Sequence, residues 1–232
     1  MTPLVLCYHA VVEGEPQRLA VRREQLESQL RSLLRRGYRP VSATDAVEQR
    51  GRLLHVTFDD AYRSVVDTLP LLDELGVPAT IFACTAYARD GRPFDVPELS
   101  EDAAADPAAF ATMDWAALRE VVSEGVEIGS HTVSHPHLPR LSDAELDREL
   151  RVSKAELEDE LSTPCRHIAY PYGQEDDRVR SAARRAGYDA AFAVDPGRGR
   201  SDRFAVPRLA VYRHDTTAGF RFRTSPLLRR LR

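Results

Sequence analysis

The sequence contains little of several residue types, and each shortage limits what the protein can be. Only three cysteines, Cys7, Cys84 and Cys165, occur in 232 residues, and they share no CxxC spacing. Their odd number and apolar surroundings predict reduced thiols rather than a disulfide framework, and a nucleophilic cysteine would need a paired base nearby. No apolar run approaches the roughly 20 residues that a transmembrane helix requires. Lys154 is the only lysine, so arginine carries nearly all of the positive charge.

The ends of the sequence and its charge narrow the choice of partners. Residues 1–6 lead straight into a strand-like segment and lack the regions of a signal peptide, so we expect a cytoplasmic protein. The net charge of −4 does not indicate a nucleic-acid partner. Residues 220–232 are basic and amphipathic, which fits peripheral contact with a membrane of anionic lipid or, as we favour, a final helix packed on the domain.

Length and hydrophobic content predict one domain over residues 1–232. With 43% hydrophobic residues the chain can bury a substantial core, and α/β barrels of this size commonly form one unit. Short apolar runs alternate with amphipathic patterns. The expected strands are 4–8, 53–58, 79–83, 126–128, 168–170, 190–194 and 209–212, and the expected helices are 22–36, 62–75, 115–123, 142–161 and 177–186. Asp114 is an expected N-cap, and Ser142 with Glu145 has the spacing of a capping box.

This alternation predicts a parallel sheet covered by helices, either doubly wound or closed into a barrel. His9, Asp59, His131 and Tyr172 each lie just after an expected strand, and polar residues that converge from several strand ends are typical of a barrel. We therefore predict an α/β barrel, irregular because only about seven strands can be counted. Residues 85–112 interrupt the pattern with an acidic connection that is either a substrate-binding lid or a solvated insertion.

Two motifs carry most of the chemical information. Residues 56–60 end in two adjacent carboxylates, Asp59 and Asp60, and residues 129–135 contain two histidines four apart, His131 and His135. One carboxylate and two imidazoles offer three ligands and leave an open position, which is the arrangement of a catalytic zinc site. The second carboxylate is then available to deprotonate a water. The motifs predict a metal-dependent hydrolase.

Taken singly, each motif has an ordinary structural explanation. An aspartate pair at a strand end is usually a helix N-cap or a solvated turn, and two histidines at this spacing are more often partly exposed polar residues. Pro136 disfavours helix at His135, so a turn can hold the pair in place of the helix of other zinc sites. The ordered combination at strand ends is far more specific than either motif alone.

Three motifs together resemble the polysaccharide deacetylases, the carbohydrate esterases related to chitin deacetylase. They are Thr-Phe-Asp-Asp at 57–60, His-Thr-Val-Ser-His at 131–135 and Tyr-Pro-Tyr-Gly at 170–173, and the resemblance extends over residues 4–212. It implies an irregular barrel of seven or so βα units, a NodB-like fold. It also implies that Asp59 is the general base and that Asp60, His131 and His135 bind the metal. Zinc is the default for these ligands, although cobalt, nickel, iron or manganese can occupy them.

The resemblance further implies which groups handle the acyl oxygen and the leaving amine. The Tyr172 backbone amide corresponds to the donor that stabilises the oxyanion. Tyr8-His9 resembles the Tyr-His pair of the poly-N-acetylglucosamine deacetylase branch, in which the histidine is the candidate acid. His214 loosely resembles the late histidine of the chitin-deacetylase branch. We favour His9, because it has the better strand context.

Three positions depart from the family pattern. Ala61 replaces the usual glycine after the aspartate pair, and we expect it to require only ordinary backbone dihedrals. Ala169 occupies the position at which many members carry an arginine that orients the base, and Arg166 is out of register to replace it. Asp114-Trp115 precedes the histidines and reads as a helix start rather than as the Asp-Trp motif of the chitin-type branch. These departures favour the poly-N-acetylglucosamine-like branch.

The sequence therefore predicts a metal-dependent N-deacetylase that acts on an amino sugar in a glycan, a glycolipid or a sugar precursor. One alternative is a related hydrolase of small amides, imides or N-formyl groups, since the same groups can serve any such carbonyl. A second alternative is a metal-bearing module that binds glycans without cleaving them. Such a module would need the three ligands but not Asp59.

Overall fold

Seven parallel strands form a closed barrel in the computed structural model, which describes residues 2–13, 19–194 and 202–225. The strands are β1 (Leu4–Tyr8), β5 (Leu53–Asp59), β6 (Ala79–Ala83), β7 (Glu127–Ser130), β8 (His167–Ala169), β9 (Ala190–Val194) and β10 (Val206–Ala210). They follow one another around the ring in this order, and β1 closes it by pairing with both β5 and β10. The predicted irregular α/β barrel is confirmed.

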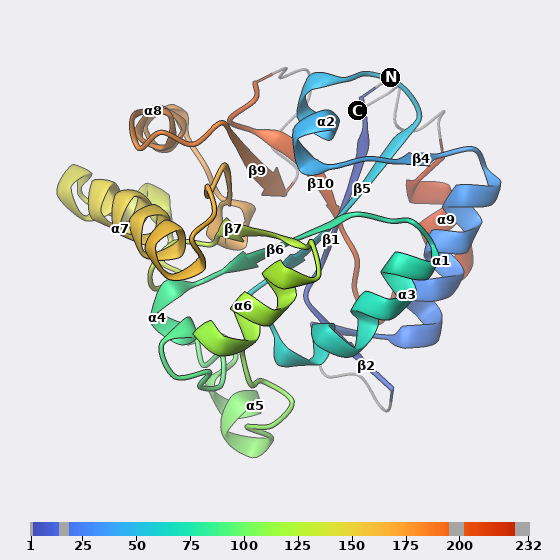
Figure 1. The fold of residues 1–232 in the computed structure, drawn as a ribbon, viewed down its shortest axis with the longest axis horizontal. Helices are drawn as coiled ribbons and strands as arrows, with labels where there is room; N and C mark the ends of the chain where they lie inside the picture. The colour runs from blue at the N-terminus through green and yellow to red at the C-terminus, as the bar shows by residue number, and fades with distance from the viewer. Residues whose placement is uncertain (1, 14–18, 195–201, 226–232) are drawn as a thin grey trace.

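Helices surround the strands (Figure 1). They are α1 (Arg23–Arg35), α3 (Leu69–Glu74), α6 (Trp115–Ser123), α7 (Asp143–Leu161), α8 (Asp177–Arg185) and α9 (Thr217–Arg223). Smaller elements are β2 (Ala10–Val12), β3 (Ala20–Arg22), β4 (Arg39–Pro40), α2 (Ala43–Glu48), α4 (Thr85–Ala88), α5 (Ser100–Ala105) and the 3-10 turns η1 (Arg63–Thr68), η2 (Leu138–Arg140) and η3 (Pro171–Gly173). The predicted caps are present, because Asp114 accepts from the Ala117 amide and Ser142 forms a full capping box with Glu145.

Side chains along each strand alternate between the helices and the barrel interior. On β5, Leu54, Val56 and Phe58 join the large hydrophobic cluster under the helices. A second cluster fills the interior and continues onto α2 and the residues before it. The interior is tightly filled, since a Cβ atom at Gly129 would lie 2.5 Å from the ring of Phe82. The polar side chains that alternate with them on β5, His55, Thr57 and Asp59, therefore lie in a space with little room for water.

Two expected elements differ clearly from those observed, and one observed helix was not expected. The expected helix 62–75 is divided into η1 and α3, and Pro70 stands in the first turn of α3, where proline is tolerated. The last strand is 206–210 rather than 209–212. Proline and arginine are unusual in a buried strand, but here Pro207 is exposed and the charge of the buried Arg208 is neutralised inside the barrel. The short α2 was not anticipated.

Residues 85–112 are an ordered part of the domain rather than a purely solvated insertion. They contain α4 and α5, and Phe94, Val96 and Phe110 are buried. Bridges Tyr62–Thr112 and Pro93–Ala111 hold the segment in place. In the carboxy-terminal segment, α9 buries Phe220, which agrees with a final helix packed on the domain, while residues 226–232 lie outside the described residues. Within the ranges that the structure describes, no helix has the length and apolar character to cross a membrane.

Candidate metal centre and active site

The turn after β5 sets the directions of the two neighbouring carboxylates. Asp60 and Ala61 have φ angles of 67° and 49°, in the left-handed region that carries a steric penalty for residues with a Cβ atom. The expectation of ordinary dihedrals at Ala61 is therefore wrong, and the glycine of the family pattern suits this turn better. The consequence is that Asp59 and Asp60, although adjacent, both project into one buried space at the carboxyl ends of the strands.

The two histidines are held by a turn, as Pro136 predicted, and not by a helix. Thr132 and His135 have φ angles of 72° and 60°. Glu149 on α7 fixes this turn, because its carboxylate accepts hydrogen bonds from the amides of Val133 (2.8 Å) and Ser134 (3.0 Å). Glu149 was not identified from the sequence, where it reads as one more charge on a surface helix.

The structure brings Asp60, His131 and His135 together as three candidate ligands. Asp60 Oδ1 lies 3.5 Å from His131 Nε2 and 3.7 Å from His135 Nε2. Two ligand atoms on a tetrahedral zinc ion are about 3.4 Å apart, given zinc–ligand distances near 2.1 Å. His131 Nδ1 contacts the Ala169 carbonyl at 2.8 Å, so Nδ1 carries the proton and Nε2 presents its lone pair to Asp60. The three residues fit a divalent cation.

Two polar atoms of this set also lack hydrogen-bond partners within the described part of the protein. Among the described residues, Asp60 Oδ1 and His135 Nδ1 are buried without a hydrogen bond. Burial and the neighbouring Asp59 charge raise the pKa of Asp60 well above its usual range, and burial beside His131 lowers the pKa of His135 to about 2. A buried carboxyl and neutral imidazoles are the groups whose lone pairs a cation would stabilise.

Asp59 is paired differently from its neighbour. Arg208 of β10 donates from Nη1 to Oδ1 (2.6 Å) and from Nη2 to Oδ2 (2.8 Å), and its side chain is fully buried. Burial favours the neutral carboxyl, but the Arg208 charge and the hydrogen bonds from Arg208 outweigh it and hold the pKa of Asp59 well below its usual range. Arg208 therefore supplies, from β10, the arginine that many family members carry at the position of Ala169. In the sequence, Arg208 could have been recognised by its position between Val206 and Ala210, two apolar residues on the same face of the strand.

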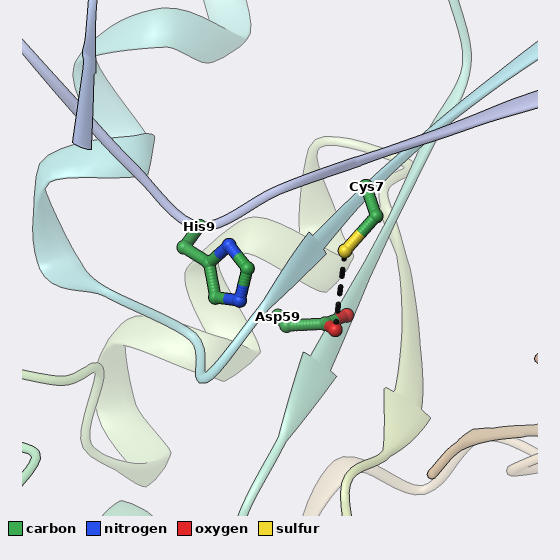
Figure 2. Close-up of side chains that lie close together, drawn as sticks. All are labelled: Cys7, His9 and Asp59. Carbon is green, nitrogen blue, oxygen red and sulfur yellow. Dashed lines mark hydrogen bonds between the residues drawn. The ribbon is translucent and has the colours of Figure 1, made fainter. Parts of the chain in front are cut away.

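Cys7 and His9 lie beside Asp59, at the end of β1 (Figure 2). The Cys7 thiol donates to Asp59 Oδ2 at 3.3 Å. His9 turns one edge of its ring toward Asp59, its Nδ1 has no hydrogen-bond partner, and burial lowers its pKa to about 4. One ligand atom each from Cys7, His9 and Asp59 lie within 4.8 Å of one another.

His9 and His214 are separated by the ring of Tyr212. His9 lines the same cavity as Asp59 and Asp60, whereas His214 lines a different, polar cavity beside α1. Tyr212 stacks on His214 with ring centroids 5.6 Å apart and faces His9 at 6.4 Å. The structure thus groups His9, and not His214, with the aspartate pair.

Tyr172 lies in the sharp turn η3 on the opposite wall. Its φ of 59° is followed by Gly173, at which a Cβ atom would lie 2.5 Å from Val194, so the motif glycine is required by close packing. The Tyr172 ring stands between His135 and His137, with centroids at 4.6 and 4.0 Å, and its hydroxyl donates to Glu98. The 85–112 segment is thereby tied to the turn that carries the Tyr172 amide.

These groups surround a cavity of about 250 Å³. Phe94, Val96 and Leu99 of the 85–112 segment form an apolar wall of this cavity. The segment therefore lines part of the candidate site, and its role as a substrate-binding lid stays a prediction.

Comparison with known proteins identifies the family. The sequence profile of the polysaccharide deacetylase family matches residues 46–191. The chain belongs to the polysaccharide deacetylase family. A chitooligosaccharide deacetylase of Bradyrhizobium sp. (strain ANU 289) is 31% identical over 172 residues, which cover 70% of this chain and 63% of that protein.

Two solved structures share the fold of this chain. The Streptococcus pyogenes deacetylase PplD, determined in complex with acetate, superposes with a TM-score of 0.78 at 20% identity, over 97% of this chain and 99% of that chain. IcaB from Ammonifex degensii superposes with a TM-score of 0.76 at 24% identity, over 94% of each chain. The fold and the family membership that the motifs implied are both confirmed.

Proposed function

We propose that this member of the polysaccharide deacetylase family is a metal-dependent hydrolase that removes N-acetyl groups from an amino sugar in a glycan, a glycolipid or a sugar precursor. The observation that carries the proposal is the unpartnered Asp60 Oδ1 beside two neutral imidazoles, with an ionised carboxylate next to it. A binding module needs no second carboxylate, whereas hydrolysis needs a base. Zinc is the expected ion, bound by Asp60, His131 and His135.

Asp59 is the proposed base that accepts a proton from the attacking water. Arg208 fixes both carboxylate oxygens and keeps Asp59 ionised, which also makes it a weak base. Proton transfer to a weak base requires a water more acidic than bulk water, which is what a divalent cation at the three ligands would supply, together with polarisation of the acyl carbonyl. The Asp59–Arg208 pair therefore supports a reaction that depends on a cation.

Two further groups have proposed roles. The backbone amide of Tyr172 is the donor for the oxyanion, and the described turns and loops contain no backbone hydrogen bond from it. His9 is the proposed acid for the leaving amine, because it lines the same cavity as Asp59. Its pKa of about 4 means that His9 is neutral at rest, so it must gain a proton before it can donate one.

The apolar wall and small volume of the cavity favour a second candidate, a hydrolase of small amides, imides or N-formyl compounds. A cavity of about 250 Å³ is below the range of about 300–1,000 Å³ that is usual for small-molecule sites. Relative turnover of N-acetylated monosaccharides, N-acetylated oligosaccharides and N-formyl compounds would separate the two candidates.

The experiment that tests the site is acetate release from an activated aryl acetate, which does not depend on the natural substrate. We would compare chelated protein, protein reloaded with zinc or cobalt, and reloaded Asp59→Asn. Release that requires metal and is absent in the variant supports the hydrolase. Release that ignores chelation and substitution, or no release from protein shown to contain metal, would favour the binding module.

A further inference from the structure

The group formed by Cys7, His9 and Asp59 has no use for its thiol in the proposed reaction. We propose that these three residues form a second cation site, selective for thiophilic divalent ions such as Cd²⁺ and Zn²⁺, and that its occupation inhibits the enzyme. Figure 2 shows the three side chains converging, with the thiol and the imidazole approaching Asp59 from β1. The inhibition depends on the proposed function, whereas the binding of the ion does not.

The distances suit a small cation. Cys7 Sγ lies 3.3 Å from Asp59 Oδ2. A sulfur and an oxygen bound to one tetrahedral zinc ion are about 3.5 Å apart, given bond lengths near 2.3 and 2.0 Å. The three ligand atoms lie within 4.8 Å of one another, so His9 is the group that must move inward by roughly an ångström. No hydrogen bond to its Nδ1 opposes this movement.

The hydrogen bond between Cys7 and Asp59 marks the position that the ion would take. Each carboxylate oxygen can accept two hydrogen bonds, and Arg208 uses one acceptor position on each oxygen of Asp59. The thiol proton uses another position on Oδ2. A thiophilic ion that replaces this proton binds the thiolate and Oδ2 without displacing Arg208, and the proton is released to solvent.

The donor atoms distinguish this site from the one formed by Asp60, His131 and His135. A thiolate favours Cd²⁺ and Zn²⁺ over Mn²⁺, whereas two imidazoles and a carboxylate accept all three ions. Asp59 lies between the two sets, with Oδ2 3.3 Å from Cys7 Sγ and 3.9 Å from His131 Nε2. An ion on the Cys7 side would occupy the proposed base and the proposed acid together, so excess zinc would stop the reaction that the first zinc supports.

The binding test uses wild-type protein with Cys7→Ala and Cys7→Ser, and needs no substrate. Chelated proteins are dialysed against Cd²⁺ or Mn²⁺, and bound metal is measured by elemental analysis. We expect two equivalents of Cd²⁺ in wild type, one in each variant, and one equivalent of Mn²⁺ in all three. The second Cd²⁺ should produce a thiolate-to-metal charge-transfer band in the ultraviolet that is absent from both variants.

Two outcomes would overturn the site. One is a single equivalent of Cd²⁺ in wild type. The other is a second equivalent, with its absorption band, that persists in Cys7→Ala and therefore comes from another thiol such as Cys84. The first equivalent retained by each variant is the control for folding, and Cys7→Ser keeps a hydrogen-bond donor to Asp59 while providing a poor ligand for Cd²⁺.

The inhibition is tested by zinc titration of aryl acetate hydrolysis, with each protein normalised to its activity at one equivalent. We expect wild type to rise and then fall as zinc increases. The inhibition constant should be at least roughly tenfold higher in Cys7→Ala, since loss of a ligand weakens metal binding at least as much as loss of a supporting residue. Two-site binding without hydrolysis in any protein would leave the second site standing and remove the proposed function. Hydrolysis by a protein that binds only one equivalent of metal would support the proposed function and remove the second site.

Discussion

At the amino ends of the barrel strands, the buried histidines have hydrogen-bond partners, whereas at the carboxyl ends two histidines have a buried nitrogen without one. His55 Nδ1 contacts the Val41 carbonyl at 2.9 Å, and its Nε2 contacts the Thr80 hydroxyl at 3.0 Å. His167 Nδ1 is paired with the Glu127 carboxylate. At the other end, His9 and His135 each have a buried Nδ1 without a partner.

The difference teaches that residue type alone does not mark a site. Histidine and carboxylate side chains occur at both ends of the same barrel, close to a hydrophobic interior that penalises unpaired polar atoms. Where every atom has a partner, the group stabilises the fold. Where atoms remain unpaired, the structure retains a cost of about 1–3 kcal/mol for each of them, which a ligand can relieve. We therefore propose that the functional site lies at the carboxyl end.

The largest effect should come from His135→Ala at the carboxyl end. In protein loaded with Mn²⁺, which the Cys7 site disfavours, removing this ligand should eliminate the bound metal and reduce hydrolysis to the level of chelated protein. Some stability should be lost because the buried ring packs against Phe94 and Tyr172, although no hydrogen bond to His135 Nδ1 is broken. Elemental analysis, aryl acetate hydrolysis and thermal melting of the chelated protein would check these outcomes. One equivalent of Mn²⁺ retained by the variant would remove His135 from the ligand set.

Asp59→Asn should separate metal binding from catalysis. Because the amide cannot accept the proton, hydrolysis should fall by roughly 10²- to 10⁴-fold while one equivalent of metal remains. Glu127→Gln is the matched carboxylate-to-amide change at the amino end, where the partner is His167. It should lower the melting temperature and leave hydrolysis within a few-fold of wild type. Similar kinetic losses in both variants would break the distinction between the two ends.

Arg208→Ala should be the most destabilising of these substitutions. It leaves the buried Asp59 carboxylate without its counter-charge, and breaking a buried pair in this way typically costs about 3–5 kcal/mol. Denaturant unfolding of the chelated protein measures the loss. Arg166→Ala is the control, because Arg166 and Asp189 form an exposed pair whose removal should change stability by less than about 1 kcal/mol. Equal losses would mean that Arg208 is not needed to hold Asp59.

The sequence was sufficient for the features that depend on local pattern. Strand alternation and the order of the motifs predicted the barrel and the convergence of the aspartate pair with His131 and His135, because each depends on neighbouring residues or on the common direction of parallel strands. The choice of Asp60 as the ligand came from the resemblance to the polysaccharide deacetylases. Because parallel strands all run in one direction, their carboxyl ends lie at the same edge of the sheet, whatever the sequences of the helices between them.

Other features depend on contacts that no local pattern specifies. Arg208 pairs with Asp59 across 149 residues of sequence, and Pro207 beside it disguises the strand. Glu149 reads as a surface charge until α7 is placed against the histidine turn. The left-handed backbone at Ala61 is imposed by the need to direct two adjacent carboxylates into one space, against the preference of alanine itself.

A smaller effect is expected from pH at the amino end. Burial lowers the pKa of His55 to about 4 from 6.5, so the unfolded chain binds the proton first as the pH falls. The stabilisation from neutral His55 is complete above pH 6.5 and is lost as the pH falls toward 4, by up to about 3 kcal/mol. His9 and His135 also have lowered pKa values, so the informative quantity is the difference between wild type and His55→Gln. Parallel stability curves from pH 7 to pH 4 would contradict the assignment to His55.

The smallest effect tests whether the carboxyl end stores strain in its backbone as well as in its unpaired atoms. Ala61→Gly should relieve the left-handed φ of 49°, although loss of a buried methyl group and a more flexible unfolded chain offset part of the gain. The expected net stabilisation is below about 1 kcal/mol. Ala155→Gly, on the exposed side of α7, should instead destabilise by about 1 kcal/mol. Thermal melting of the two variants should therefore show changes in stability of opposite sign. Equal losses of stability would show that the turn after β5 holds Ala61 without strain.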